Sequence, residues 1–415
     1  MKSMSVGVVI LGAGQAGAQL AASLRENGWR DRITLVGDEP HLPYQRPPLS
    51  KAYLKAPLPE ERLHLKPASF YRDRDIEVRL GARAASIETA SRRVRLADGE
   101  TIAYSTLVIA TGTRPRIVAM PGLGLEGVVS LRSIADVDLM RPVMEGARRI
   151  AVVGGGYIGL EVAAVLSEMG REVVVVEAED RVLKRVTSPV VSTFYERLHA
   201  RHGVEIVKAA RVASILGERH VTGLALCDGR TLAADAVLLA VGAVSNDEIA
   251  RNAGIAVDNG IVVDAFGRTS VPQVFACGDC AGFASRRYGR RVRIESVQNA
   301  IDQAKCVGAT IAGQPTAHDP VPWFWSDQYR TKLQIAGLYT AGDHVTIEGD
   351  TERGPLVVEY RRNGRLVAVD AIDNARAHML ARRRIAEETA ASVDPLSFDD
   401  GAVNGTEAPV AISLA

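Results

Sequence analysis

The chain has 415 residues, with 50 lysines and arginines against 49 aspartates and glutamates, which leaves a formal net charge of +1. This balance argues against a chain built to bind nucleic acid or an anionic membrane, so any charged docking surface must be local. No apolar run approaches the ~20 residues that cross a bilayer, and no signal-peptide pattern precedes the first predicted strand. Length and composition therefore predict a soluble, cytoplasmic protein of about three domains, each long enough to bury a core.

The first predicted element is an apolar strand at residues 8–11, and a glycine-rich turn follows it. The turn reads Gly-Ala-Gly-Gln-Ala-Gly from Gly12 to Gly17. In dinucleotide-binding units the first glycine allows a tight turn, the second lets the backbone approach a pyrophosphate, and the third lets helix and strand pack closely. The next apolar strand, residues 33–36, leads to Asp38, where an acid can accept hydrogen bonds from both hydroxyls of an adenosine ribose.

A proline-rich segment, residues 43–51, comes next and carries Arg46 and Lys51. Prolines fix the backbone and disfavour helix, so this segment should hold both cations in place. The plainer alternative is that both are surface loop charges. Further along, residues 106–112 predict a buried strand that is closed by a turn of small residues.

The glycine pattern occurs a second time. Residues 150–153 predict a strand, Gly154 to Gly159 read Gly-Gly-Gly-Tyr-Ile-Gly, and the strand at 173–176 ends at Glu177. A single pattern of this kind would be weak evidence. Two copies, each in the full order of strand, turn, helix, strand and acid, predict that the chain binds two dinucleotides.

Charge at the end of the second unit favours NADH over NADPH. Glu177 and Glu179 would repel a 2′-phosphate, and no arginine stands at the positions where one would bind it. Arg181 and Arg185 follow slightly later and could reach a phosphate, so NADPH stays open.

The order of the elements predicts an α/β fold with two Rossmann-like dinucleotide-binding domains and a small α+β C-terminal domain. The two halves repeat one plan, since residues 236–242 match the strand at 106–112. From about residue 245, short strands and a helix over 296–312 indicate a return to the first domain. We expect domains at residues 1–113 with 245–320, at 114–244 and at 321–390, followed by a flexible tail at 391–415.

The four cysteines do not make a disulfide scaffold in a chain of this length. Cys277 and Cys280 form a Cys-x-x-Cys pair, which invites a dithiol interpretation. The Gly278-Asp279 between them follows a short predicted strand and is better explained as a cofactor contact. Cys227 and Cys306 are isolated in the sequence.

Two motifs complete a family pattern, Cys-Gly-Asp-Cys at residues 277–280 and Trp-Phe-Trp-Ser-Asp-Gln-Tyr at residues 323–329. Together with both glycine turns and the Pro-Pro-Leu-Ser-Lys loop, they resemble FAD-dependent ferredoxin reductases of the putidaredoxin reductase group, within the glutathione reductase fold family. The resemblance extends from residue 6 to about residue 385. It implies an enzyme that passes electrons from NADH through FAD to an acidic 2Fe-2S ferredoxin, which serves a haem-thiolate monooxygenase or a ring-hydroxylating dioxygenase.

The resemblance also implies the site residues, with no metal ligand among them. FAD would be held by Gly12, Gly14, Ala16, Gly17, Asp38, Arg46, Lys51, Ala84, Arg132, Asp279, Val297 and Trp325. NADH would be held by Gly155, Tyr157, Ile158, Glu161, Glu177, Arg185 and Gly242. Lys51 and Glu161 would pair beside the reacting rings, where the cation stabilises the reduced flavin and the carboxylate orients the nicotinamide.

Each of these assignments has a plainer alternative. Glu161 could face solvent, Asp279 could merely cap a following helix, and Trp323 and Trp325 could be core aromatics. Several basic residues could form the ferredoxin docking site or could be ordinary solvated charges: Arg62, Lys66, Arg72, Arg376 and the arginines at 382–384.

Three other functions use similar patterns. An NADH oxidase or peroxidase, like a disulfide reductase, needs a reactive cysteine in the first domain, and residues 12–112 contain no cysteine. A rubredoxin reductase differs chiefly in its partner. A flavin-bearing binding protein of the apoptosis-inducing-factor type would act as a scaffold rather than as a catalyst.

Overall fold

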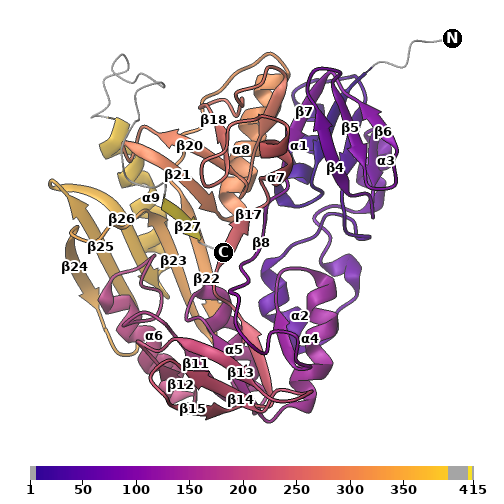
Figure 1. The fold of residues 1–415 in the computed structure, drawn as a ribbon. Helices are drawn as coiled ribbons and strands as arrows, with labels where there is room; N and C mark the ends of the chain where they lie inside the picture. Colours follow the sequence, from indigo (N-terminus) through magenta and orange to yellow (C-terminus); the bar gives the residue numbers. More distant parts are fainter. Residues whose placement is uncertain (1–5, 391–409, 414–415) are drawn as a thin grey trace.

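The computed structural model describes residues 6–390 and 410–413. Within these residues the chain forms two parallel α/β units and a C-terminal unit built on an antiparallel sheet (Figure 1). This arrangement confirms the α/β class expected from the sequence. The residue limits of the individual domains stay a prediction.

The first parallel sheet has the strand order β19-β7-β1-β2-β3. β1 (Val8–Leu11) lies at its centre and pairs with β2 (Ile33–Val36) and β7 (Thr106–Ile109). All residues of β1 are buried, which is why this strand reads as a continuous apolar run. β3 (Ile76–Arg79) and β19 (Val274–Ala276) form the edges, so a strand from late in the sequence completes the first sheet.

Two helices of the first unit pack against each other. α1 (Gln15–Glu26) follows the first glycine turn, and α8 (Val297–Ile311) lies along it. Ser296 caps α8, because its hydroxyl accepts a hydrogen bond from the backbone N–H of Asn299 at 3.1 Å. The smaller elements are η1 (Pro47–Ser50), α2 (Ala52–Lys55), η2 (Glu60–Arg62), α3 (Ala68–Asp73) and the antiparallel strands β4 (Ala84–Glu88), β5 (Arg93–Leu96) and β6 (Thr101–Ala103).

The second parallel sheet repeats this plan with the order β12-β11-β10-β16-β9. Its central strand β10 (Arg149–Val153) pairs with β11 (Glu172–Val176) and β16 (Ala236–Leu239), as β1 pairs with β2 and β7. α5 (Tyr157–Glu168) follows the second glycine turn. The other elements are β9 (Val128–Ser130), α4 (Ile134–Gly146), α6 (Pro189–Arg201), β12 (Glu205–Val207), β13 (Val212–Leu216), β14 (Gly223–Leu226) and β15 (Thr231–Ala233).

The chain enters and leaves the second unit through two short strands. These are β8 (Thr113–Pro115) and β17 (Ala243–Ser245), which pair with each other in antiparallel fashion. Because both crossings are tied together, the second unit is attached to the first by a two-stranded connection.

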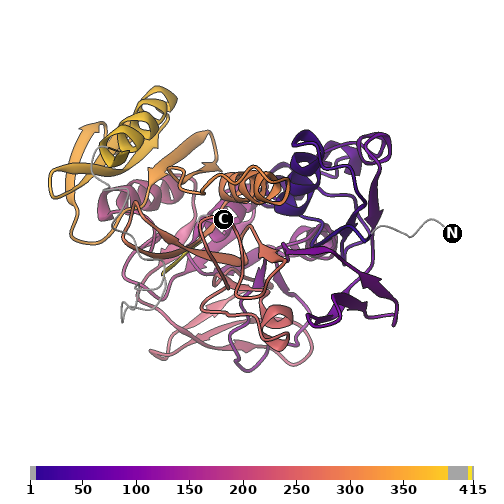
Figure 2. The ribbon, with the colours of Figure 1, turned by 90° about the horizontal axis from the view of Figure 1, so that it is seen from above.

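The C-terminal unit is an antiparallel sheet with the order β22-β23-β26-β25-β24. Its strands are β22 (Trp323–Gln328), β23 (Thr331–Gly337), β24 (His344–Gly349), β25 (Leu356–Arg362) and β26 (Arg365–Ile372). α9 (Ala375–Ala390) packs on β23 and β26 (Figure 2). The edge strand β22 contacts α5 and α8, so it lies against both parallel units. The largest buried cluster contains Val9, Val152 and Leu333, and its core is therefore continuous across the three sheets.

A further sheet corrects one expectation. It joins β18 (Ile261–Val263), β20 (Ala281–Ser285), β21 (Arg290–Glu295) and β27 (Val410–Ser413), and the short helix α7 (Glu248–Asn252) precedes it. The sequence placed residues 410–413 in a flexible tail, but they pair in parallel with β21. Unlike the four-residue strand at 8–11, this one leads into no glycine-rich turn, and its partner is distant in the sequence. The rest of the expected tail, residues 391–409 and 414–415, lies outside the described residues.

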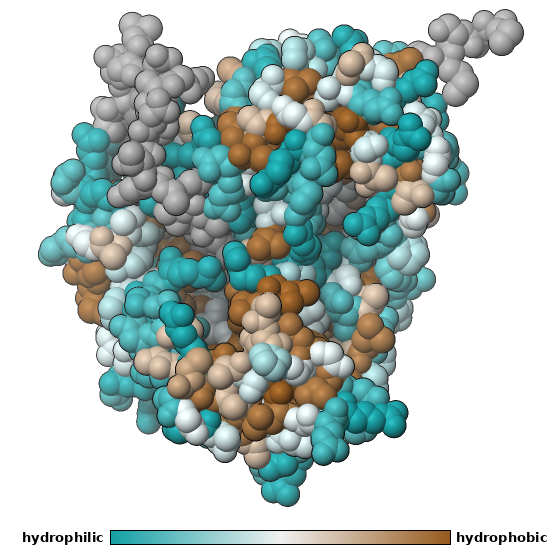
Figure 3. Space-filling model, in the orientation of Figure 1, coloured by the Kyte–Doolittle hydropathy of each residue, from teal (hydrophilic) through white to brown (hydrophobic). Residues whose placement is uncertain are grey.

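On the face drawn in Figure 3, polar residues occupy much of the rim and apolar residues gather toward the middle. Ile117 and Val118, in the loop after β8, are exposed by 72% and 43%. None of the helices within residues 6–390 combines the length and the apolar character that a membrane crossing requires.

Candidate functional site

A first cavity opens where the first glycine turn, the loop at residues 37–51, the start of α8 and β22 meet. Gly12 has φ +112°, and a Cβ on it would lie 2.1 Å from the carbonyl oxygen of Ala110, so this turn requires glycine. Gly14 is the N-cap residue of α1 and has open space where a side chain would stand. The backbone N–H groups at the N-terminus of α1 therefore face the cavity with no side chain over them, which is the arrangement that binds a pyrophosphate.

Most of the predicted FAD residues line this cavity: Gly12, Gly14, Ala16, Asp38, Arg46, Lys51, Arg132, Asp279, Val297 and Trp325. Two predicted contacts do not. A Cβ on Gly17 would lie 1.9 Å from the carbonyl oxygen of Gly12, so Gly17 serves the packing of α1 against the turn instead. Ala84 begins β4 and pairs with Leu96, away from the cavity lining.

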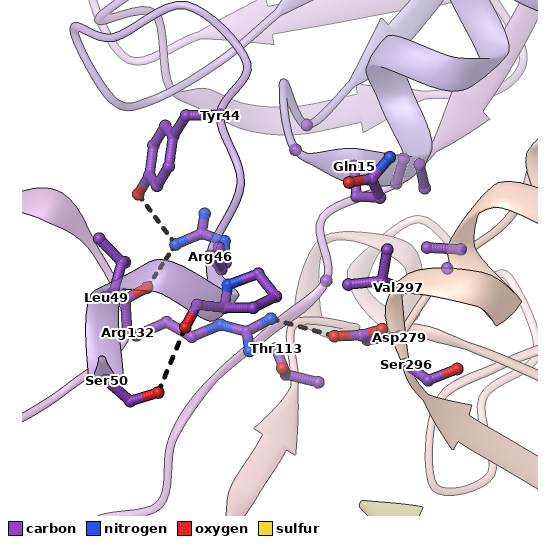
Figure 4. A pocket seen from close by; sticks show the side chains of 18 of the residues that line it. Gln15, Tyr44, Arg46, Leu49, Ser50, Thr113, Arg132, Asp279, Ser296 and Val297 are labelled. Atoms are coloured by element: carbon purple, nitrogen blue, oxygen red, sulfur yellow. Dashed lines mark hydrogen bonds and ion pairs between the residues drawn. The ribbon is translucent and has the colours of Figure 1, made fainter. Parts of the chain in front are cut away.

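Hydrogen bonds fix Arg46 inside this cavity. Its guanidinium donates to Glu39 Oε1 at 2.7 Å, to the hydroxyl of Tyr44 at 3.1 Å and to the carbonyl of Arg132 at 2.6 Å. The side chain of Arg132 in turn reaches Asp279 in an ion pair of 3.0 Å (Figure 4). Arg46 is therefore held in place at the cavity, with 31% of its side chain exposed.

Asp279 and the start of α8 line the same cavity (Figure 4). Burial raises the pKa of the Asp279 carboxyl, although Arg132 opposes the change. The element after Asp279 is strand β20, so the alternative that Asp279 caps a following helix is wrong. Val297 is the first residue of α8, and its backbone N–H is among those that a helix leaves without an internal partner.

Lys51 and Glu161 meet at the edge of the first cavity. Lys51 Nζ lies 2.5 Å from Glu161 Oε2, and Ser50 Oγ donates to the same oxygen at 2.5 Å. Ser326 Oγ donates to the other oxygen, Oε1, at 2.7 Å. The Glu161 side chain is only 5% exposed, so the solvent-facing alternative is wrong. Neither serine was singled out from the sequence.

The two tryptophans of β22 have different surroundings. Trp325 lines the first cavity, together with Phe324. The ring of Trp323 lies 5.7 Å from that of Trp325, and the guanidinium of Arg382 lies 4.8 Å from the Trp323 ring. Both indoles are only partly buried, so they are not simple core aromatics. Trp323 connects Trp325 at the cavity with α9.

The second glycine turn has the same geometry as the first. Gly154 has φ +111°, and a Cβ there would lie 2.3 Å from the carbonyl oxygen of Ala240. Gly156 has open space at its Cβ position, and a Cβ on Gly159 would lie 2.1 Å from the carbonyl oxygen of Gly154. The bare end of α5 can therefore receive a second pyrophosphate.

This second cavity is lined by Gly155, Tyr157, Ile158, Glu177, Arg185 and Gly242, as the resemblance implies. Glu161, the remaining residue assigned to NADH, lines the first cavity instead. Leu131, Arg132, Tyr157 and Ile158 line both cavities. The two cavities thus meet at the first turn of α5, where a ring bound in one can lie against a ring bound in the other.

Charges in the second cavity bear on the choice of nucleotide. Glu177 accepts hydrogen bonds from the backbone N–H of Gly155 at 2.6 Å and of Glu179 at 2.8 Å, which hold its carboxylate in the cavity. Arg181 donates to Ser192 Oγ at 2.7 Å, so its guanidinium is already engaged. Lys184, which sequence reasoning missed, also lines the cavity and pairs with Glu179 at 2.8 Å.

The cysteines do not form a reactive pair. Cys277 and Cys280 are both fully buried as free thiols. Burial raises the pKa of both, and most strongly that of Cys277. A redox-active pair instead needs an exposed thiolate with a lowered pKa.

Comparisons with known proteins establish the family. The family model described as pyridine nucleotide-disulphide oxidoreductase matches residues 6–304, and a model described as reductase C-terminal matches residues 323–404. The chain belongs to the pyridine nucleotide-disulphide oxidoreductase family, and the proteins of this family use FAD and NAD(P)H.

Individual proteins match nearly the whole chain. Rhodocoxin reductase of Rhodococcus erythropolis is 41% identical over 382 residues, which cover 92% of this chain and 90% of that protein. The solved covalent complex of putidaredoxin reductase with putidaredoxin matches with a TM-score of 0.90 at 37% identity, over 93% of this chain and 94% of that chain. A ferredoxin reductase of Rhodopseudomonas palustris matches with a TM-score of 0.90 at 41% identity, and the match covers 95% of this chain and 98% of that chain. The family resemblance predicted from the motifs is confirmed.

The residues present fit the two cofactors. Each cavity has a bare helix end for a pyrophosphate and an acid after the second strand of its sheet, Asp38 in the first and Glu177 in the second. The first cavity adds the helix end at Val297 and the cation Lys51, which suit the electron-rich edge of a reduced flavin.

Proposed function

We propose that this chain is an FAD-dependent NADH:ferredoxin reductase, whose 2Fe-2S ferredoxin serves a monooxygenase or a ring-hydroxylating dioxygenase. The observation that carries the proposal is the meeting of two dinucleotide cavities at Tyr157 and Ile158. FAD held by the residues of the first cavity would supply the chemistry that takes up a hydride from a nicotinamide and releases the electrons singly to an iron-sulfur partner. The similarity to a ferredoxin reductase and to putidaredoxin reductase supports this function.

The side chains supply position and electrostatic field. Lys51 holds a positive charge at the edge of the first cavity, where it favours the added negative charge of a reduced ring. Glu161 holds a carboxylate at the same place, where it can accept a hydrogen bond from a nicotinamide amide. No side chain needs to act as a nucleophile, and the buried thiols of Cys277 and Cys280 take no part.

We further propose that NADH is preferred over NADPH. The Glu177 carboxylate is held at the end of the second strand of its unit, where the acid of such a unit meets the adenosine ribose. There it would repel a 2′-phosphate. Among the nearby cations, Arg181 is bonded to Ser192 and to the carbonyls of Thr187 and Lys184, and Lys184 is paired with Glu179. Arg185 also lines the cavity, so the proposed preference rests on the Glu177 carboxylate.

We place the ferredoxin contact beside α9. Arg382 lies over Trp323, which leads to Trp325 at the first cavity. Met379 and Leu380 on the same helix are exposed by 66% and 51%. The exposed apolar side chains can pack against an apolar part of a protein partner, and the cation can pair with its acidic residues.

We also propose that the protein works in the cytoplasm. All four of its cysteines lie in the described part of the chain and are free thiols, which is typical of a reducing compartment.

Stopped-flow absorbance tests the proposed function. We expect NADH to bleach the flavin of the purified FAD-bound protein faster than NADPH does, and a 2Fe-2S ferredoxin to restore the oxidised spectrum quickly. Reoxidation by rubredoxin alone would favour a rubredoxin reductase. A flavin that NADH does not bleach would contradict the proposal and favour a binding protein.

A further inference from the structure

The Glu161 carboxylate is the meeting point of all three units of the chain. Glu161 lies on α5 of the second unit, and its Oε2 receives Lys51 and Ser50 from the first unit, both at 2.5 Å. Its Oε1 receives Ser326 from the C-terminal sheet at 2.7 Å. The Ser326 side chain belongs to a fully buried residue. The C-terminal unit, whose Phe324 and Trp325 also line the first cavity, therefore reaches the Glu161 carboxylate through one hydroxyl.

The alternation of β22 explains why this hydroxyl points inward. Along the strand, Phe324, Ser326 and Gln328 are buried, whereas the residues between them are partly exposed. In a strand, alternate residues share one face, so these three face the interior together. β22 contacts α5, which carries Glu161.

A line of hydrogen bonds fixes the direction in which Ser326 donates. Gln328 Nε2 donates to Ser326 Oγ at 3.2 Å, and Gln328 Oε1 lies 2.8 Å from His199 Nε2. Burial lowers the pKa of His199 to about 4, so its ring is neutral near pH 7. An amide oxygen only accepts, so His199 Nε2 carries the proton, and His199 Nδ1 accepts from the Tyr329 hydroxyl at 3.1 Å.

The consequence for Ser326 follows from counting its bonds. A serine hydroxyl has one proton and can also accept. Because Ser326 Oγ accepts from Gln328, its single proton is free to point at Glu161 Oε1. The line from Tyr329 to Ser326 thus sets one orientation for the serine and, through it, for the carboxylate.

We propose that Ser326 is a positioning residue for hydride transfer, which holds the Glu161 carboxylate in the orientation that meets both Lys51 and the nicotinamide. This inference rests on the proposed function. It assigns to the C-terminal unit, which contributes no glycine turn, a direct part in completing the nicotinamide site.

Ser326→Ala tests this role in the FAD-bound protein. We expect the rate of flavin reduction at saturating NADH to fall roughly tenfold, as expected when a hydrogen bond to a charged group is lost. FAD content per chain should not change. The affinity for NAD+, measured by titrating the oxidised protein, should weaken in parallel, because the carboxylate no longer holds one orientation. Ser326→Thr keeps the hydroxyl and should restore both values.

A second background separates positioning from a general loss of packing. In a Glu161→Ala background there is no carboxylate to orient, so Ser326→Ala should cause no further loss of rate or of NAD+ affinity. Thr310→Val is the matched control, because it removes a buried hydroxyl whose hydrogen bond within the described residues stays inside α8, to the carbonyl of Cys306 at 2.9 Å. This control should react like the unchanged protein.

The outcomes distinguish the inference from the proposed function. If NADH fails to reduce the unchanged protein, the proposed function is wrong. If NADH reduces it and Ser326→Ala is equally fast, or if Ser326→Ala slows the Glu161→Ala background by the same factor, the positioning role is wrong and the proposed function stands.

Discussion

Three carboxyl side chains of this protein have different partners and therefore different properties. Glu161 is bound by a cation and two hydroxyls, and Glu177 by two backbone N–H groups. Asp370, on β26, is fully buried with no cation beside it in the described structure. Its Oδ2 accepts from the Tyr360 hydroxyl at 2.5 Å, while Oδ1 has no hydrogen-bond partner among the described atoms. Burial raises the pKa of Asp370 from 3.8 to about 7.

Asp370→Asn should change how stability depends on pH. Between about pH 4 and pH 7 the folded chain holds a proton on Asp370 that the unfolded chain has lost, so this group lowers the free energy of unfolding as pH rises through that window. Asparagine cannot ionise. In urea unfolding, the free energy of unfolding of the variant should therefore rise relative to that of the unchanged protein between pH 5 and pH 8. The relative increase should be on the order of 2 kcal/mol.

Glu348→Gln is a suitable control for that measurement, since Glu348 is exposed on β24 and should leave the pH dependence as it was. A difference between Asp370→Asn and the unchanged protein that stays constant from pH 5 to pH 8 would show that Asp370 is not protonated in the folded chain.

Sequence reasoning at the residue scale succeeded where the physics is local. The turns at Gly12 and Gly154 follow from the backbone conformation that glycine permits, and both have the positive φ expected of them. Ser326 could not be found this way, because its partner Glu161 is 165 positions away in the sequence. The family resemblance assigned Gly17 to the cofactor, whereas the motif itself gives the third glycine to packing, and the structure agrees with the motif.

At the scale of elements, the length of a pattern decided what could be predicted. The helix expected over residues 296–312 is observed as Val297–Ile311. It could be predicted because it is long and because Ser296 is a residue that favours the start of a helix. β27 was missed, because no motif stands beside Val410–Ser413 in the sequence and the strand is defined by its pairing with the distant β21. The contact of β22 with α5 was missed for the same reason, since no local pattern encodes a contact between distant elements.

The basic residues considered for docking differ in their partners. Ion pairs already engage Arg72 with Asp73, Arg383 with Glu387 and Arg384 with Glu359. Arg62, Lys66 and Arg376 are exposed, and Arg382 lies over Trp323. Arg382 is the candidate whose ring contact leads toward the first cavity, and this contact is the reason for choosing it as the test of docking.

Arg382→Glu should raise the KM for ferredoxin several-fold at low ionic strength, because it reverses a charge in the proposed contact. The difference from the unchanged protein should shrink as salt is added. Reduction of ferricyanide, a small acceptor, should respond much less. Arg93→Glu, an exposed charge on β5, serves as the control. Equal ferredoxin KM values for Arg382→Glu and Arg93→Glu at every salt concentration would rule out docking at α9.

At the scale of the whole molecule, the repeat in the sequence predicted two similar units, and the structure shows two parallel sheets with matching central strands. The sequence did not indicate how these units face each other. That arrangement depends on β8 with β17, on the return of β19 to the first sheet and on β22, which packs against both units. Such long-range packing leaves no periodic signal, yet it makes the two cavities meet at α5.

Transfer of deuterium from NADH tests most directly whether the cavities hold the nicotinamide against the flavin. The FAD-bound protein is mixed in a stopped-flow instrument with saturating NADH that carries deuterium at one or the other C4 position. We expect one of the two labelled forms to slow the bleaching of the flavin and the other to leave it unchanged, because a ring fixed between Tyr157, Ile158 and the first cavity presents a single face. Equal slowing by both forms, or slowing by neither, would contradict a fixed, face-to-face arrangement of the two rings.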